Sequence, residues 1–383
     1  MPGRGHAHPR TRVVARLVLV PAVLLALLAG TAGGLVRAGI VLPASGAWLG
    51  QAVLGHAFLM ICAFMGTVIG IERAVAVRQP LAFAAPLASA SAGVLHLAGA
   101  AHTATWVAAA AALAFVAVNM LVVARQRAAH TVLLLTGALA WLAGNGLLVA
   151  GASPSAVIPW WFSFLVLTIA AERLEMTRLM RRHQGASQML YVILAAMLLG
   201  SALSGVSPQW GGLLYGASLA GLAAWLLAFD VARRTVRTRG LSRYMAVCLL
   251  LGYFWLAVSG LAWCMSSLGL PTRDAALHAL ALGFVFSMML GHAPVILPAV
   301  ARVKLLFGWA FYLPLLLLHG SLAVRLLARH ADLGSLAAGA AGNALAMALF
   351  AATLAGSAIA WRVRHAPSHI PSTGSHDDAV AAP

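Results

Sequence analysis

Long apolar runs divide this sequence, and they limit its fold more than any other feature. Each run has about 20 residues, the length that an α-helix needs to cross the hydrocarbon core of a bilayer. The twelve runs lie near residues 14–36, 48–71, 81–102, 104–124, 131–151, 157–177, 188–206, 210–230, 244–266, 275–299, 309–328 and 335–360. Only 9% of all residues are charged, against about 25% in soluble domains. We therefore predict an all-α polytopic membrane protein with twelve transmembrane helices.

The two ends of the chain differ from this apolar part. Residues 1–13 are basic and polar, and residues 362–383 are rich in Pro, Ser and His. We expect a cytoplasmic N-terminal tail, a membrane domain of residues 14–361 and a disordered cytoplasmic C-terminal tail. The first apolar run lacks a convincing cleavage site and is followed by further runs, so we expect an anchor rather than a cleaved signal peptide.

The formal net charge of +17 would suggest a nucleic-acid partner in a soluble protein. Here the basic residues lie between apolar runs, so we expect a lipid bilayer and no nucleic acid. With the N-terminus in the cytoplasm, 21 of the 25 Lys and Arg residues fall on the cytoplasmic side, and Arg37, Arg273, Arg325 and Arg329 fall on the other. This positive-inside bias predicts a multi-pass protein of a bacterial-type inner (plasma) membrane with both termini in the cytoplasm.

Two histidines open two similar segments. His56 begins HAFLMICAFMGTVIG, and His278 begins HALALGFVFSMMLGHAP, each followed by Phe, Met and Gly at similar offsets. In the predicted topology the second and tenth spans run in the same direction, and both histidines lie roughly 6 to 12 Å below the outer boundary. An ionisable side chain at this depth is costly, which makes both residues functional candidates.

Two neutral imidazoles at one depth on different helices can supply both axial ligands of a haem iron. We therefore predict a b-type haem between His56 and His278, and the apolar, Phe- and Met-rich surroundings suit a large flat macrocycle. The alternative is that each imidazole is hydrogen-bonded to a neighbouring helix and holds no cofactor. The cysteines, Cys62, Cys248 and Cys264, form no CxxC or CxxCH, which argues against a covalently attached c-type haem.

A second polar site is expected among the glutamates and the other histidines of the spans, which are Glu72, Glu172, Glu175, His292 and His319. On straight helices, His292 lies within about 40° of His278, but Glu72 is about 160° from His56, so the second span cannot direct both of its groups to one site. Carboxylates and an imidazole at the cytoplasmic ends of the spans could bind a cation or relay protons. The alternative is a set of interfacial ion pairs that fix the helix ends.

The polar and histidine-bearing spans follow a period of four. Spans 2, 6 and 10 carry most of the residues singled out above, and this spacing suggests three repeats of a four-helix unit in a pseudo-threefold arrangement. Gly66 and Gly70 in span 2 form a GxxxG pair, which predicts the close approach of a neighbouring helix.

The segments LGHAFLMICAFMGTVIG and ALHALALGFVFSMMLGHAP resemble the haem-copper oxidase subunit I superfamily, and within it the NnrS-type membrane proteins. The resemblance covers the whole transmembrane portion. It implies an oxidase-like twelve-helix fold in which His56 and His278 hold a low-spin haem. The likeness to NnrS-type proteins also implies copper as a possible second metal, and a role in nitric oxide or nitrosative stress.

The chain also departs from these patterns. Spans 6 and 7 have no histidine for copper, span 10 has no closely spaced second histidine, and Ala57 and Phe58 follow His56 where NnrS-type sequences have an acidic residue. We therefore predict that the protein is not a terminal oxidase and belongs to a neighbouring branch.

The functions left open are of different classes. The first is haem-based membrane redox chemistry or a nitrosative-stress response, with an unidentified electron donor. The main alternative is a proton-coupled transporter without a cofactor, and a weaker one is a non-catalytic partner or assembly factor of a respiratory complex. The sequence contains no Walker A, GxSxG or HExxH motif, so a soluble-type hydrolase has no support.

Overall fold

A computed structural model describes residues 9–43, 46–176, 185–328 and 333–365 of the chain. Much of both predicted tails, residues 1–8 and 366–383, lies outside the described residues, as do Arg178, Arg181, Arg182 and Arg329. The first helix begins at Pro9, within the segment predicted to be the N-terminal tail, and the last helix ends at Arg364, three residues beyond the predicted membrane domain.

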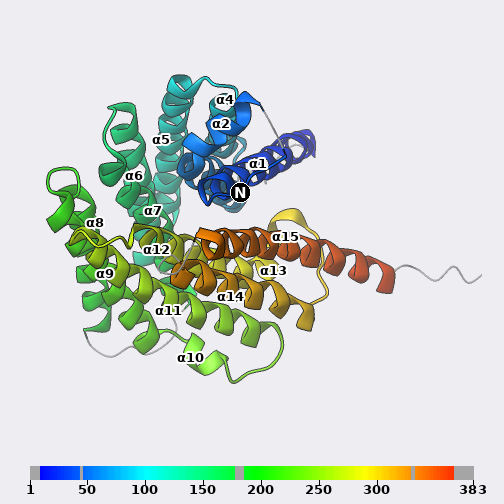
Figure 1. The fold of residues 1–383 in the computed structure, drawn as a ribbon. Helices are drawn as coiled ribbons and strands as arrows, with labels where there is room; N and C mark the ends of the chain where they lie inside the picture. Colours follow the sequence, from blue (N-terminus) through cyan, green and yellow to red (C-terminus); the bar gives the residue numbers. More distant parts are fainter. Residues whose placement is uncertain (1–8, 44–45, 177–184, 329–332, 366–383) are drawn as a thin grey trace, which may run out of the picture.

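All regular structure in the described part of the chain is helical (Figure 1). The elements are α1 (Pro9–Arg37), α2 (Ala47–Leu54), η1 (Phe58–Met65), α3 (Gly66–Val77), η2 (Pro80–Phe83), α4 (Ala84–Leu97), α5 (Ala101–Arg125), α6 (Ala129–Val149), α7 (Pro154–Met176), α8 (Ala186–Leu203), α9 (Pro208–Phe229), α10 (Ala232–Thr235), α11 (Leu241–Ser267), α12 (Arg273–His278), η3 (Ala279–Phe286), α13 (Ser287–Ala301), η4 (Trp309–Phe311), α14 (Tyr312–Ala328) and α15 (Leu333–Arg364). They form twelve helical segments long and apolar enough to cross a membrane. The chain is therefore a multi-pass membrane protein, as the apolar runs predict.

Helices that follow one another in the sequence mostly pack side by side, because short connections join antiparallel neighbours. The helices α4, α5, α6 and α7 form one such series, α8, α9 and α11 a second, and α14 with α15 a third (Figure 1).

Three spans form the centre of the bundle. Buried residues make up 67% of the most apolar stretch of span 2 (Phe58–Val77), 78% of span 6 (Pro154–Met176) and 61% of span 10 (Arg273–Pro298). The same share is at most 56% in every other span that the structure describes. The three most buried spans are thus every fourth span of the chain, the period noted in the sequence. Two of them contain the segments that follow His56 and His278.

Spans 2 and 10 are not straight α-helices. Each contains a π-helix of eight residues, η1 in span 2 and η3 in span 10. The backbone bonds of a π-helix run from i to i+5, so each turn is wider and the following residues are rotated. Angles calculated for straight helices therefore do not hold between His56 and Glu72, or between His278 and His292.

The GxxxG pair of span 2 is confirmed as a close-packing site. A Cβ atom built at Gly66 would lie 2.8 Å from Oγ of Ser89 in α4, and one at Gly70 would lie 3.1 Å from Cβ of Pro86. The helix α4 therefore packs against the glycine face of span 2, and it can do so because both glycines lack a side chain.

Candidate functional site

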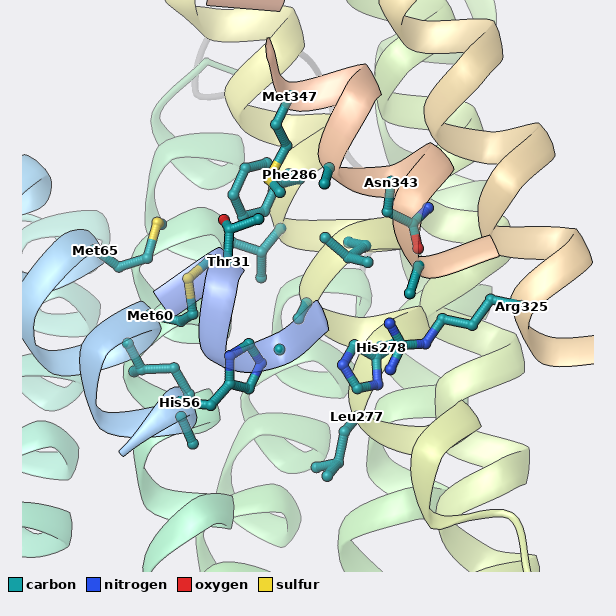
Figure 2. A pocket seen from close by; sticks show the side chains of 18 of the residues that line it. Thr31, His56, Met60, Met65, Leu277, His278, Phe286, Arg325, Asn343 and Met347 are labelled. Carbon is teal, nitrogen blue, oxygen red and sulfur yellow. The ribbon is translucent and has the colours of Figure 1, made fainter. Parts of the chain in front are cut away.

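A large cavity lies between the segments that carry His56 and His278 (Figure 2). Its walls come from α1, η1, α7, α12, η3, α14 and α15, and the empty space, its open side included, is about 950 Å³. Most lining side chains are apolar, and the polar ones are Thr31, His56, His278, Arg325 and Asn343. The structure therefore brings both predicted haem ligands to one apolar cavity, although they are far apart in the sequence.

The two imidazole rings lie on either side of this cavity (Figure 2). Their centroids are 6.4 Å apart, and their planes differ by 25°. Ordinary aromatic pairs also have such separations, so the distance alone does not identify a ligand site. It does match a metal held between two imidazoles, since two bonds of about 2 Å, with roughly 1 Å more from each nitrogen to its ring centre, give roughly 6 Å.

The hydrogen bonds of the two imidazole rings determine which ring nitrogen is free to bind a metal. Nδ1 of His56 lies 2.7 Å from the carbonyl oxygen of Gly30, and Nδ1 of His278 lies 3.0 Å from that of Asp274. A carbonyl oxygen only accepts, so Nδ1 carries the proton in both rings and Nε2 keeps its lone pair. Neither Nε2 atom has a hydrogen-bond partner among the described residues. Histidines that bind metals are held in this way.

His56 is seated against a glycine-rich face of α1. A Cβ atom built at Gly34 would lie 2.7 Å from Cε1 of His56, and one at Gly30 would lie 2.7 Å from Sδ of Met60. Only glycine at these places lets α1 approach closely enough for the Gly30 carbonyl to accept from the ring. The first span, which the sequence presents as a simple anchor, therefore positions His56.

Both histidines stand at the start of a π-helix. His278 is the residue before η3, and only Ala57 separates His56 from η1. Single π-turns are rare and are often found at functional sites. The two histidine segments thus resemble each other in backbone structure as well as in sequence.

A carboxylate and a guanidinium lie behind His278. Oδ1 of Asp274 is 3.0 Å from Nδ1 of His278 and 3.0 Å from Nη2 of Arg325, and Oδ2 is 3.1 Å from Nε of Arg325. Arg325 is only 8% exposed. The pair therefore carries no net charge, which lowers the cost of placing both groups within the membrane.

The second predicted site divides in the structure. Glu72 interacts electrostatically with Glu172, Arg73 and His292, so these groups gather where spans 2, 6 and 10 approach their Arg-rich ends. Nδ1 of His292 lies 2.7 Å from the Met288 carbonyl oxygen. Within the part of the chain that the structure describes, no group of three or more His, Cys, Asp and Glu residues is placed to hold a metal ion.

Glu175 and His319 have other surroundings. Glu175 has a side chain 48% exposed, and its Oε1 lies 3.9 Å from Nε2 of His130. His319 accepts a hydrogen bond at Nδ1 from the Trp255 indole at 2.7 Å, and its Nε2 lies 3.2 Å from Oγ of Ser287. Both nitrogens of His319 are thus used in joining α14 to α11 and α13.

Sequence reasoning missed two ion pairs, one partly buried and one fully buried. One is Asp274 with Arg325, and the other is Arg173 with Asp230, whose two hydrogen bonds are both 2.9 Å long. The position of Asp274 one helical turn before His278 is a signal that could have drawn attention to it. Partners that are 51 and 57 residues apart in the sequence have no local signal.

The fold and the cavity define the class of the protein, a twelve-span membrane protein with two histidines across an apolar cavity. A family model described as a domain of unknown function (DUF8744) matches residues 16–359, and the chain belongs to this family. No curated protein and no solved structure matches the chain.

Proposed function

We propose that the protein is a haem-binding membrane protein in which His56 and His278 are the two axial ligands of one b-type haem. The observation that carries this proposal is the pair of rings 6.4 Å apart, each with Nδ1 bonded to a carbonyl oxygen and each lining the same cavity. His319, by contrast, uses both of its ring nitrogens in hydrogen bonds to neighbouring helices.

The lining of the cavity also fits the group. A haem is a broad apolar disc with two carboxylates, and the cavity combines many apolar side chains with the Arg325 guanidinium. When bound, haem would supply one-electron redox chemistry. Two protein ligands would leave no open coordination position, so electron transfer suits this site better than binding of a gas at the iron. The residues of the chain would orient the disc and exclude water.

Within this proposal, the protein serves membrane redox chemistry linked to nitric oxide or nitrosative stress, in the manner of NnrS-type proteins. The central place of spans 2, 6 and 10 supports an oxidase-like arrangement of three four-helix units. We further propose an inner (plasma) membrane location with both termini in the cytoplasm, based on the distribution of Lys and Arg. Copper and the electron donor are not assigned to any residue.

The experiment compares the haem content and the reduced-minus-oxidised spectra of the purified wild type with those of His56→Ala and His278→Ala. We expect a sharp α band in the wild type and at least a tenfold loss of haem in each variant. The matched control is His292→Ala, because His292 lies on the same span as His278 and is also bonded to a backbone carbonyl through Nδ1. Haem retained at wild-type levels in both ligand variants would contradict the assignment.

A second candidate is a proton-coupled transporter without a cofactor. The gathering of Glu72, Glu172 and His292 within spans favours it, because ionisable groups inside a membrane often mark a proton path. This reading predicts a colourless purified protein that moves protons across vesicle membranes, with the flux abolished in Glu72→Gln. Absence of flux together with a haem spectrum would exclude it.

A further inference from the structure

We propose that Asp274 and Arg325 are a positioning pair that controls how strongly His278 donates to the haem iron, so that the two axial ligands are electronically unequal. This inference rests on the proposed function, because it concerns the same haem. It assigns to two residues a role in setting the reduction potential.

The geometry holds the carboxylate in one place. Arg325 binds both oxygens of Asp274 in a fork, with separations of 3.0 and 3.1 Å. The oxygen Oδ1 also lies 3.0 Å from Nδ1 of His278. Because Arg325 is on α14 and Asp274 is on α12, the fork ties two helices together and prevents the carboxylate from turning away from the imidazole. Figure 2 shows the Arg325 side chain beside His278 at the wall of the cavity.

The ring of His56 has no such partner. Its Nδ1 faces only the neutral carbonyl of Gly30, at 2.7 Å, in the described part of the chain. Nδ1 of each ring is hydrogen-bonded to a backbone carbonyl, but only His278 also has a carboxylate oxygen 3.0 Å from the same nitrogen. The negative charge of this carboxylate polarises the N–H bond of His278 more than a neutral carbonyl does alone. A carboxylate on the far nitrogen also makes a metal-bound imidazole more basic. His278 would therefore be the stronger donor to a bound haem iron, and it would favour the ferric form more than His56 would.

The two residues act in opposite directions. Asp274 draws the Nδ1 proton of His278 toward itself, which raises the electron density at Nε2. Arg325 shares the charge of the same carboxylate and so moderates this effect. Removing the negative charge should raise the reduction potential, whereas removing the positive charge should lower it.

The test is a redox titration of the purified haem protein, with low-temperature electron paramagnetic resonance of its ferric form. In Asp274→Asn the side chain keeps its shape and a neutral acceptor, so haem should remain bound. We expect the reduction potential to rise by about 59 mV, which is a tenfold change in the ratio of ferric to ferrous affinity. We also expect the low-spin g values to spread further apart, because His278 becomes a weaker donor. Arg325→Gln should shift the potential downward.

The matched control is Asp230→Asn. Asp230 likewise binds an arginine through both carboxylate oxygens, but its partner is Arg173 and it does not contact either His56 or His278. The reduction potential and the g values of the Asp230→Asn protein should equal those of the wild type.

Each outcome decides the matter. A haem protein whose potential is the same in Asp274→Asn as in the wild type would overturn the inference while leaving the haem assignment intact. A shifted potential with unchanged g values would show an effect of charge alone and would also overturn it. If the Asp274→Asn protein does not accumulate, the reduction potential and the g values of Arg325→Gln provide the same test. A wild type that contains no haem would instead overturn the proposed function.

Discussion

Gly34 is the residue on which the position of His56 depends most directly. The imidazole lies so close to α1 that a Cβ atom at this position would be 2.7 Å from Cε1. A methyl group there must displace the ring or the helix, and overpacking of this kind costs about 1 to 3 kcal/mol.

We therefore predict that Gly34→Ala lowers haem content severalfold while the protein still inserts into the membrane. The measurement is haem per chain, determined by pyridine haemochrome and amino-acid analysis. Gly50→Ala is the control, because a Cβ atom at Gly50 has nothing within 4 Å. Equal haem content in the two variants would show that α1 does not position His56.

The buried pair of Arg173 and Asp230 belongs to stability rather than to the site. Both side chains are almost fully buried, at 3% and 1% exposure. Asp230→Ala removes both hydrogen bonds from the carboxylate to the buried Arg173 guanidinium, so it should lower the free energy of unfolding by about 3 to 5 kcal/mol. Glu175→Ala, in an exposed pair with His130, should change it by less than about 1 kcal/mol. Denaturant unfolding in detergent compares the two, and similar values for both would contradict this account.

At the scale of elements, the two π-helices are the least ordinary parts of the structure. Each follows one of the proposed ligands, and each changes the rotation of its span between the cavity and the Arg-rich end. Their wider turns decide which side chains of spans 2 and 10 face the cavity.

We predict that deleting Ala63 from η1 converts the segment to an ordinary α-helix and turns His56 away from His278. Haem should then be lost, whereas the helix content measured by circular dichroism should stay within a few per cent of that of the wild type. Deletion of Arg239 in the loop before α11 is the control and should leave haem content unchanged, because exposed loops tolerate such changes. Haem at the wild-type level in the Ala63 deletion would count against the role given to η1.

The elements also show how far the sequence predicts this molecule. Run length alone identified the twelve spans, because a bilayer demands a fixed length of apolar helix. Two similar segments pointed to His56 and His278, and the structure places the centroids of their rings 6.4 Å apart. The π-helices were not predicted, since the run of apolar residues in Phe58–Met65 is compatible with either helix type. The contact of His56 with Gly34 and the ion pair of Asp274 with Arg325 depend on packing between spans that are distant in the sequence. The pattern of a single segment does not contain this information.

At the scale of the whole molecule, the twelve spans found among the described residues predict that Pro9 and His365 lie on the same side of the membrane. The distribution of Lys and Arg predicts that this side is the cytoplasm. The loop between α8 and α9 would then be external, and the loop between α10 and α11 would be cytoplasmic.

Labelling with a membrane-impermeant maleimide tests this orientation. In intact cells we expect Val206→Cys to be labelled and Arg239→Cys to be labelled only after lysis. Two of the native cysteines, Cys62 and Cys248, are buried, and Cys264 is partly buried, so the wild type is the control for background. The reverse pattern of labelling would contradict the predicted topology.

The most direct test of the central claim is the absorption spectrum of the reduced wild-type protein before and after addition of carbon monoxide. Two histidine ligands should give the sharp α band of a low-spin b-type haem, and carbon monoxide should leave it unchanged because no coordination position is open. A spectrum without haem bands, or one that carbon monoxide shifts, would contradict a haem held between His56 and His278.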